Sequence, residues 1–148
     1  MKKYPYRLDL DNVPDKVAEV MAVYSNPFSN AILARSGVKT SFVADLMQLL
    51  GLKKQETASL ISISTKTLDR HLSTEKPFTG LQSDRILELA ELHQKGEQVF
   101  GNNAKFLLWL DSPIAVLNNT APREWLDTQQ GIKAITNELG RIEHGIFA

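Results

Sequence analysis

A run of hydroxyl and basic side chains between residues 64 and 71 is the stretch of the sequence best suited to bind a ligand. The run reads STKTLDRH, and at helical spacing its polar members fall on one outward face. Hydroxyl, ammonium and guanidinium groups hydrogen-bond to phosphate oxygens and to base edges in the major groove. The pattern therefore predicts contact with DNA, and a merely solvated helix face is the alternative. The residues predicted to touch DNA are Ser64, Thr65, Lys66, Thr67 and Arg70.

The sequence around this run predicts a helix-turn-helix, the motif that holds a second helix at a steep angle to the first. Apolar residues recur at helical spacing from Lys53 onward, and the Ser64 hydroxyl is placed to cap the second helix. Ala58 is small enough for the two helices to cross closely, and Ile63 would fill the angle between them. Glycine is the usual residue at the turn, so Ser62 either takes a positive φ there at some energetic cost or forces a slightly different turn.

The sequence offers no arrangement of groups for catalysis or metal binding. It contains no cysteine, which removes thiol nucleophiles, disulfides and thiolate metal ligands. Its three histidines, His71, His93 and His144, show no metal-ligand spacing. There is no GxSxG motif, no glycine-rich phosphate loop and no nucleophile near a base. We therefore expect a binding protein without enzyme activity, catalytic residues, metal or cofactor.

Length, charge and hydropathy narrow the class of protein further. With 148 residues and 43% hydrophobic side chains, the chain can bury a core as one medium domain or two small ones. Its 17 basic and 17 acidic residues cancel, so DNA contact must come from a local patch rather than a global field. Apolar runs such as FLLWL are short, and no basic start leads into an apolar run. These features predict a cytoplasmic protein that does not enter a membrane.

Apolar periodicity predicts an all-α protein with no convincing strand. Residues 1–12 lack a sustained period and are interpreted as an arm, while residues 28–40 are ambiguous. The Ser41 hydroxyl is expected to cap a strongly apolar helix that Gly51 ends. Four further helices are expected at Pro14 to Asn26, from Leu81 or Ser83 past Gly96, at Ala104 to Leu110 and at Pro122 to Leu126. A last helix is expected to begin with a capping box of Asp127 and Gln130 and to end near Gly145.

Two apolar stripes predict self-association, one along residues 81–99 and the other along residues 132–142. Together they offer more apolar face than a chain of this length is expected to cover internally. A single helix-turn-helix also contacts too few phosphates for tight binding, so a homodimer that reads two half-sites one DNA turn apart is expected. Trp109 and Trp125 lie in apolar helical segments and are assigned to the core rather than to an interface.

The C-terminal third carries a series of sequence marks in a fixed order. The first is VFG before a helix, and the second is a WL pair that is followed by a proline. The third is a leucine followed by a turn and a proline. Gly131 then opens a helix, and a closing RIExG ends at Gly145. In these marks the segment resembles the toxin-binding domain of the Xre/MbcA/ParS antitoxin family, and the preceding helix-turn-helix extends the resemblance over residues 42–148. The family often has glycine where this chain has Asn118 and Asn119, and asparagine also tolerates the left-handed backbone.

The resemblance implies an antitoxin that binds a RES-domain toxin, a type of enzyme that consumes NAD, and represses its own operon. Together with the arm and helix that the sequence pattern predicts over residues 1–40, it gives an Xre-like helix-turn-helix region over 41–100 and a toxin-binding domain over 101–148. The end of the last helix and the tail would block the toxin's nucleotide cleft. The residues expected to do so are Arg141, Glu143, His144, Ile146, Phe147 and Ala148.

Two other interpretations stay open from the sequence. The first is a plain helix-turn-helix transcriptional regulator whose C-terminal domain only dimerises. The second is an enzyme, for which no residue has been found to carry the chemistry.

Overall fold

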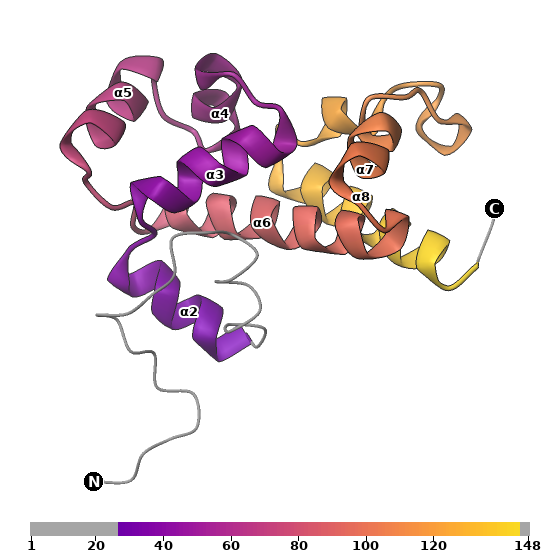
Figure 1. Ribbon diagram of the computed structural model, residues 1–148, viewed down its shortest axis with the longest axis horizontal. Coiled ribbons are helices and arrows are strands. Elements are labelled where there is room, and N and C mark those ends of the chain that lie inside the picture. Colours follow the sequence, from indigo (N-terminus) through magenta and orange to yellow (C-terminus); the bar gives the residue numbers. More distant parts are fainter. Residues whose placement is uncertain (1–26, 146–148) are drawn as a thin grey trace, which may run out of the picture.

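The computed structural model describes residues 27–145, and the protein is helical over that range (Figure 1). The predicted all-α class is confirmed, since extended pairing among these residues is limited to two isolated bridges, Val38 with Phe78 and Ile114 with Thr120. The expected arm and the helix from Pro14 lie outside the described residues. The elements are α2 Pro27–Ser36, α3 Thr40–Leu50, α4 Lys54–Leu60, α5 Thr65–Thr74, α6 Leu81–Phe100, α7 Asn103–Leu110, the 3-10 helices η2 Ala115–Leu117 and η3 Pro122–Trp125, and α8 Gln129–Glu143.

The long helix α6 is the element on which the others pack. Figure 1 shows it running along the molecule, with α3, α4 and α5 toward its N-terminal end and α7 and α8 toward its C-terminal end. Helices α2, α3, α7 and α8 all contact it. It is therefore buried on several sides, and it joins the helix-turn-helix to the C-terminal helices. Over residues 27–145, no helix combines the length and the apolar character needed to cross a membrane.

The two apolar stripes predicted to drive self-association pack against each other. Helices α6 and α8 lie side by side (Figure 1). Gln129 Nε2 of α8 donates to Glu88 Oε1 of α6 at 2.8 Å, and Glu143 of α8 forms an ion pair with Lys95 of α6. The premise that both stripes stay uncovered is wrong, because each stripe covers the other. The α8 side chains buried in this contact region are Ile132, Ile135 and Leu139.

The two ends of α3 differ in how well the sequence predicts them. Gly51 ends the helix in the left-handed conformation, with φ 65°, as predicted. Ser41 is not its cap: Lys39 holds the N-cap position and makes no side-chain cap bond. The reason is that backbone bonds to Phe78 hold Val38 extended, so the helix begins two residues later.

The start of α8 also departs from the prediction. Thr128 caps the helix, and its Oγ1 accepts from Gly131 N at 3.0 Å. The predicted capping box of Asp127 with Gln130 is wrong, because the chain becomes extended only at Thr128. Gly131 does open the helix as predicted, and packing requires it, since a Cβ there would overlap the carbonyl oxygen of Trp125.

Candidate functional site

Helices α4 and α5 form the predicted helix-turn-helix. Ser62 lies in the turn with φ 62°, so of the two outcomes expected at this position the structure has the positive φ. The turn is closed by a hydrogen bond from Ile63 N to the Ala58 carbonyl at 2.9 Å. Ile61 in the turn and Leu68 on α5 are both fully buried. Burial of Leu68 fixes which face of α5 packs on the core and leaves the opposite face to solvent.

The five residues predicted to touch DNA lie together at the start of α5. Ser64 is the N-cap: its Oγ accepts from Thr67 N at 3.1 Å and donates to Thr67 Oγ1 at 2.9 Å. Thr65 is half-buried. Lys66 and Arg70 are exposed, and their spacing of four residues puts them on the same face of the helix. These two cations are therefore the groups of the set most available to a phosphate.

An ion pair that the sequence pattern does not predict joins the two helices of the motif. Lys54 Nζ on α4 lies 2.8 Å from Asp69 Oδ1 on α5. Both side chains are about half exposed, at 57% and 49%, so the pair adds little stability. It offsets the one carboxylate within the predicted DNA-binding run. The sequence shows that basic residues surround the motif, but it does not show that Lys54 pairs with Asp69, because spacing alone does not say which acidic group each basic one contacts.

The C-terminal end of α5 is held by an aromatic contact. The His71 ring stacks on Phe78 with a centroid distance of 4.3 Å and an interplanar angle of 12°. His71 Nδ1 also lies 2.9 Å from the Lys76 carbonyl oxygen. Because Phe78 also pairs with Val38, two residues before α3, this contact ties the C-terminal end of α5 to the segment that leads into α3.

The chain between α7 and α8 is fixed by polar contacts. Arg123 in η3 donates to both carboxylate oxygens of Asp111, with Nη2 3.2 Å from Oδ2. Asn118 and Asn119 take left-handed conformations with φ 54° and 59°, which confirms the predicted backbone at this turn. The segment thus has a defined surface despite its short elements.

Three large apolar side chains of this region face solvent. The exposed fraction is 71% for Leu108, 50% for Val116 and 42% for Trp125. The prediction that Trp125 lies in the core is wrong, because its Nε1 donates to Thr120 Oγ1 at 2.8 Å at the surface. Trp109 does pack, partly buried, against the core. Apolar spacing could not separate the two tryptophans, since both lie in apolar helical segments.

The residues predicted to block a toxin lie at the end of α8 and beyond it. Arg141 and His144 are exposed, and Arg141 Nη1 is 3.8 Å from Glu138 Oε2. The hydrogen bond from Lys95 lowers the pKa of the Glu143 carboxyl below its usual value, and the charges of Lys95 and His144 act in the same direction. The remaining three predicted residues lie outside the described part of the chain: Ile146, Phe147 and Ala148.

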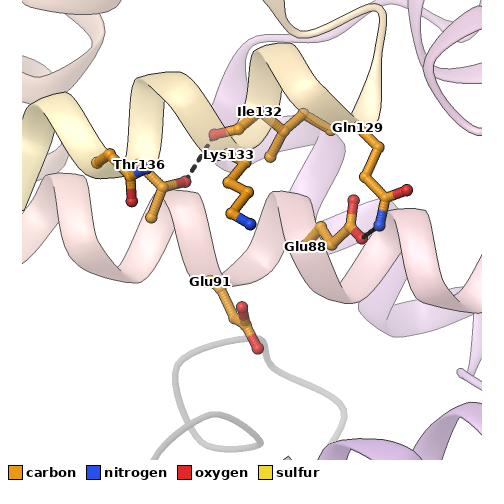
Figure 2. Close-up of a pocket in the computed structure, with 7 residues that line it drawn as sticks. Glu88, Glu91, Gln129, Ile132, Lys133 and Thr136 are labelled. Carbon is orange, nitrogen blue, oxygen red and sulfur yellow. Dashed lines mark hydrogen bonds between the residues drawn. The ribbon is translucent and has the colours of Figure 1, made fainter.

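A shallow hollow lies between α6 and α8 (Figure 2). Its volume of about 230 Å³ is below the roughly 300 Å³ at which small-molecule sites begin. Figure 2 shows the Gln129 amide meeting the Glu88 carboxylate, and the Thr136 hydroxyl bonding back to the Ile132 carbonyl. Within residues 27–145, no group of three or more histidine, aspartate or glutamate residues could hold a metal ion. We assign no ligand to this hollow.

Two parts of the chain match domains of one protein family. Residues 31–91 match the antitoxin Xre-like helix-turn-helix domain, and residues 95–145 match the antitoxin Xre/MbcA/ParS C-terminal toxin-binding domain. Antitoxin Xre of Photorhabdus laumondii subsp. laumondii is 30% identical over 125 residues, which cover 84% of each chain. Antitoxin Xre of Yersinia enterocolitica is 26% identical over 127 residues, which cover 82% of this chain and 86% of that one.

A solved structure shows the same fold. The chain is similar to one in the crystal structure of the M. tuberculosis MbcT-MbcA toxin-antitoxin complex, with a TM-score of 0.55 and 19% identity. The match covers 74% of this chain and 96% of that chain.

A helix-turn-helix region followed by a helical toxin-binding domain defines the class of protein as the antitoxin of a toxin-antitoxin system. The chain belongs to the Xre/MbcA/ParS antitoxin family, as the two adjoining domain matches and the 30% identity over 84% of its length establish.

Proposed function

We propose that the chain neutralises a RES-domain toxin that consumes NAD and represses the operon that encodes the pair. The observation that carries the proposal is the presence of a toxin-binding domain and a helix-turn-helix domain in one chain. Both activities consist of binding to a partner, so neither of them needs a reactive group. The proposed division is residues 1–40 as arm and helix, 41–100 as the DNA-binding region and 101–148 as the toxin-binding domain.

Two sets of side chains support contact with a toxin. The first is the proposed plug of Arg141, Glu143, His144, Ile146, Phe147 and Ala148, whose charged groups would occupy the polar cleft that otherwise binds NAD. The second is the exposed apolar trio of Leu108, Val116 and Trp125. Exposed apolar patches mark interaction sites, and tryptophan is among the residues that most often carry the binding energy at an interface.

DNA binding is proposed for α5, with Lys66 and Arg70 on phosphates. Ser64 and Thr67 bond to each other at the helix start, so their first role is to fix the N-terminus of α5. The backbone N–H groups at that end then point toward a groove or phosphate, as helix N-termini do in protein–DNA contacts.

A homodimer is proposed for the DNA-bound state. Since α6 and α8 cover each other, the dimer must form through another surface. Phe28 and Ile32 on α2 are exposed at 75% and 38%, and they lie one helical turn apart. This pair supplies an apolar strip through which two copies could present two α5 helices to successive half-sites.

The plain regulator is the second candidate function. The observation in its favour is that Leu108, Val116 and Trp125 could serve as a dimer face as well as a toxin face. The two functions differ in one respect, because a plain regulator needs no toxin.

Co-expression with the product of the neighbouring gene separates the two functions. We expect the toxin alone to lower cellular NAD and stop growth, and the full chain to restore both. We also expect the full chain to bind a duplex taken from its own promoter. If the full chain binds its promoter but does not protect cells from the product of the neighbouring gene, the protein is a plain regulator and not an antitoxin.

A further inference from the structure

Phosphate contacts alone cannot distinguish the chain's own promoter from other DNA. Contacts to phosphates fix the position of a protein on the duplex, whereas the sequence is read by groups that reach the base edges. Of the α5 residues proposed for DNA binding, Lys66 and Arg70 are placed on phosphates. Ser64 and Thr67 hydrogen-bond to each other, and Thr65 is half-buried. A side chain that reads a base is therefore still to be identified on α5.

Asp69 lies beside these cations on the exposed side of α5. It follows Lys66 by three residues and precedes Ser73 by four, spacings that make side chains neighbours on a helix surface. Its side chain is 49% exposed. The Ser73 hydroxyl donates back to the Arg70 carbonyl at 3.2 Å, so this donor is already engaged within the helix. Asp69 is the one side chain between residues 64 and 73 that, when ionised, can only accept a hydrogen bond.

The ion pair with Lys54 makes a carboxylate at this position compatible with DNA. Phosphates would repel an uncompensated carboxylate, but Lys54 Nζ on α4 lies 2.8 Å from Asp69 Oδ1 and balances its charge. The same contact orients the carboxylate. An ionised carboxylate has about four acceptor positions on its two oxygens, so the bond to Lys54 leaves capacity for a further donor.

We infer that Asp69 reads a cytosine in the major groove by accepting a hydrogen bond from the N4 amine, and that Lys54 is its positioning residue. The inference rests on the proposed function, because it requires α5 to lie in the major groove of the operator. Cytosine presents only a donor at this edge, whereas adenine presents the acceptor N7 beside its amine. Guanine and thymine present acceptors, which a carboxylate repels.

The alternative is that the Lys54–Asp69 pair only joins α4 to α5. A half-exposed pair adds little stability in that role. The two roles differ in one measurable property, because a pair that only joins two helices has no influence on which base is preferred.

The test compares the base preference of the parent chain with those of Asp69→Ala and Asp69→Asn. Each full-length chain selects duplexes from libraries in which the base pairs of its own promoter site are randomised one at a time, and sequencing reports the preferred base at each position. Fluorescence anisotropy then gives the affinity for single duplexes. The matched control is Lys66→Ala, which removes a proposed phosphate contact from the same helix. Circular dichroism must show that every variant remains helical.

We expect the parent to prefer cytosine at one position of each half-site and to lose about fivefold or more in affinity when that base is changed. In Asp69→Ala the preference at that position should fall below about twofold, with the other positions unchanged. Asp69→Asn should prefer adenine there, since an amide can bond to both N6 and N7. Lys66→Ala should weaken binding to every duplex by a similar factor, because a phosphate contact carries no sequence information.

The positioning role of Lys54 is tested by Lys54→Gln and Lys54→Arg. Arginine keeps a cation that can hold the Asp69 carboxylate, so Lys54→Arg should retain the cytosine preference that Lys54→Gln loses. Thermal unfolding of both variants measures any contribution of the pair to stability. A Lys54→Gln variant with the full cytosine preference would remove Lys54 from the reading of the base.

Two results would overturn the assignment of Asp69. One is an Asp69→Ala variant that keeps every base preference of the parent. The other is the loss, in that variant, of a preference for a base other than cytosine. A parent chain that binds none of the duplexes contradicts the proposed operator binding itself, and this result is distinct because it appears before any variant is compared.

Discussion

The Phe106 ring lies against the backbone of Gly96, and this packing sets how closely α7 approaches α6. A Cβ at position 96 would overlap two carbons of the ring and lie 2.6 Å from a third. Phe106 is fully buried and Gly96 is buried. A glycine that the sequence marks only as a weak point in a helix is therefore the residue that allows the toxin-binding region to dock.

Gly96→Ala should lower the free energy of unfolding by about 1–3 kcal/mol, because the added methyl forces Phe106 to move in a packed core. Gly140→Ala is the matched control, since nothing lies within 4 Å of a Cβ there. It should raise stability by about 0.4–1 kcal/mol through the unfolded chain. Urea unfolding measures both. Equal stability of the two variants would show that Phe106 does not pack closely on Gly96.

Ser62→Gly should stabilise the protein by roughly 0.5–1 kcal/mol, since glycine adopts φ 62° without the cost that serine bears. Ser59→Gly, at an exposed position of α4, is the opposite control and should destabilise by about 0.5 kcal/mol. Thermal unfolding measures the pair. A lower melting temperature for Ser62→Gly would contradict the turn geometry.

Lys66→Ala with Arg70→Ala should weaken operator binding and reduce its salt dependence. Removal of one cation from a phosphate should lower the slope of log affinity against log salt by roughly one. Lys105→Ala with Lys133→Ala removes two exposed cations from the toxin-binding region and should leave the slope unchanged. If the two double variants have the same slope, α5 is not part of the DNA interface. Circular dichroism must confirm that both remain helical.

Glu143 should titrate below an ordinary glutamate, because its carboxylate accepts a hydrogen bond from Lys95. A lowered pKa means that the pair stabilises the fold above the glutamate's unfolded pKa and that this stabilisation disappears as the pH falls through its folded pKa. Carbon-detected NMR of the side-chain carboxyl measures the pKa. In Lys95→Met it should return toward the usual glutamate value, and no change would show that the pair does not form in solution.

The helices and the helix-turn-helix could be predicted from the sequence because they depend on local patterns. Ser64 as a cap, Ser62 at positive φ and Gly51 as a stop all depend on residues close in the chain. The failures have non-local causes. The helix start next to Ser41 is decided by pairing across to Phe78.

The candidate site was less predictable for the same reason. The bond from Arg123 to Leu50 spans 73 positions, and no periodicity reveals it. The exposure of Trp125 depends on a turn whose shape the sequence does not show. The burial of the apolar stripes of α6 and α8 against each other could not be predicted either, because the sequence does not show how the chain runs between the two helices.

Deletion of residues 143–148 should abolish toxin inhibition and keep operator binding. The deletion leaves the α8 stripe intact through Ile142, so the fold should survive, while the groups proposed to enter the toxin cleft are removed. The comparison variant is Leu108→Ser, which alters the second proposed toxin contact, the apolar trio, and keeps the tail. If the deleted chain inhibits fully and Leu108→Ser does not, the apolar trio rather than the tail is the inhibitory surface.

Toxin neutralisation itself is tested by the rate at which the purified RES-domain toxin consumes NAD while the full chain is titrated in. We expect NAD consumption to fall in proportion to added chain and to stop at a fixed molar ratio, as tight occupancy of a site requires. NAD consumption that continues unchanged in the presence of excess chain would contradict the proposed function.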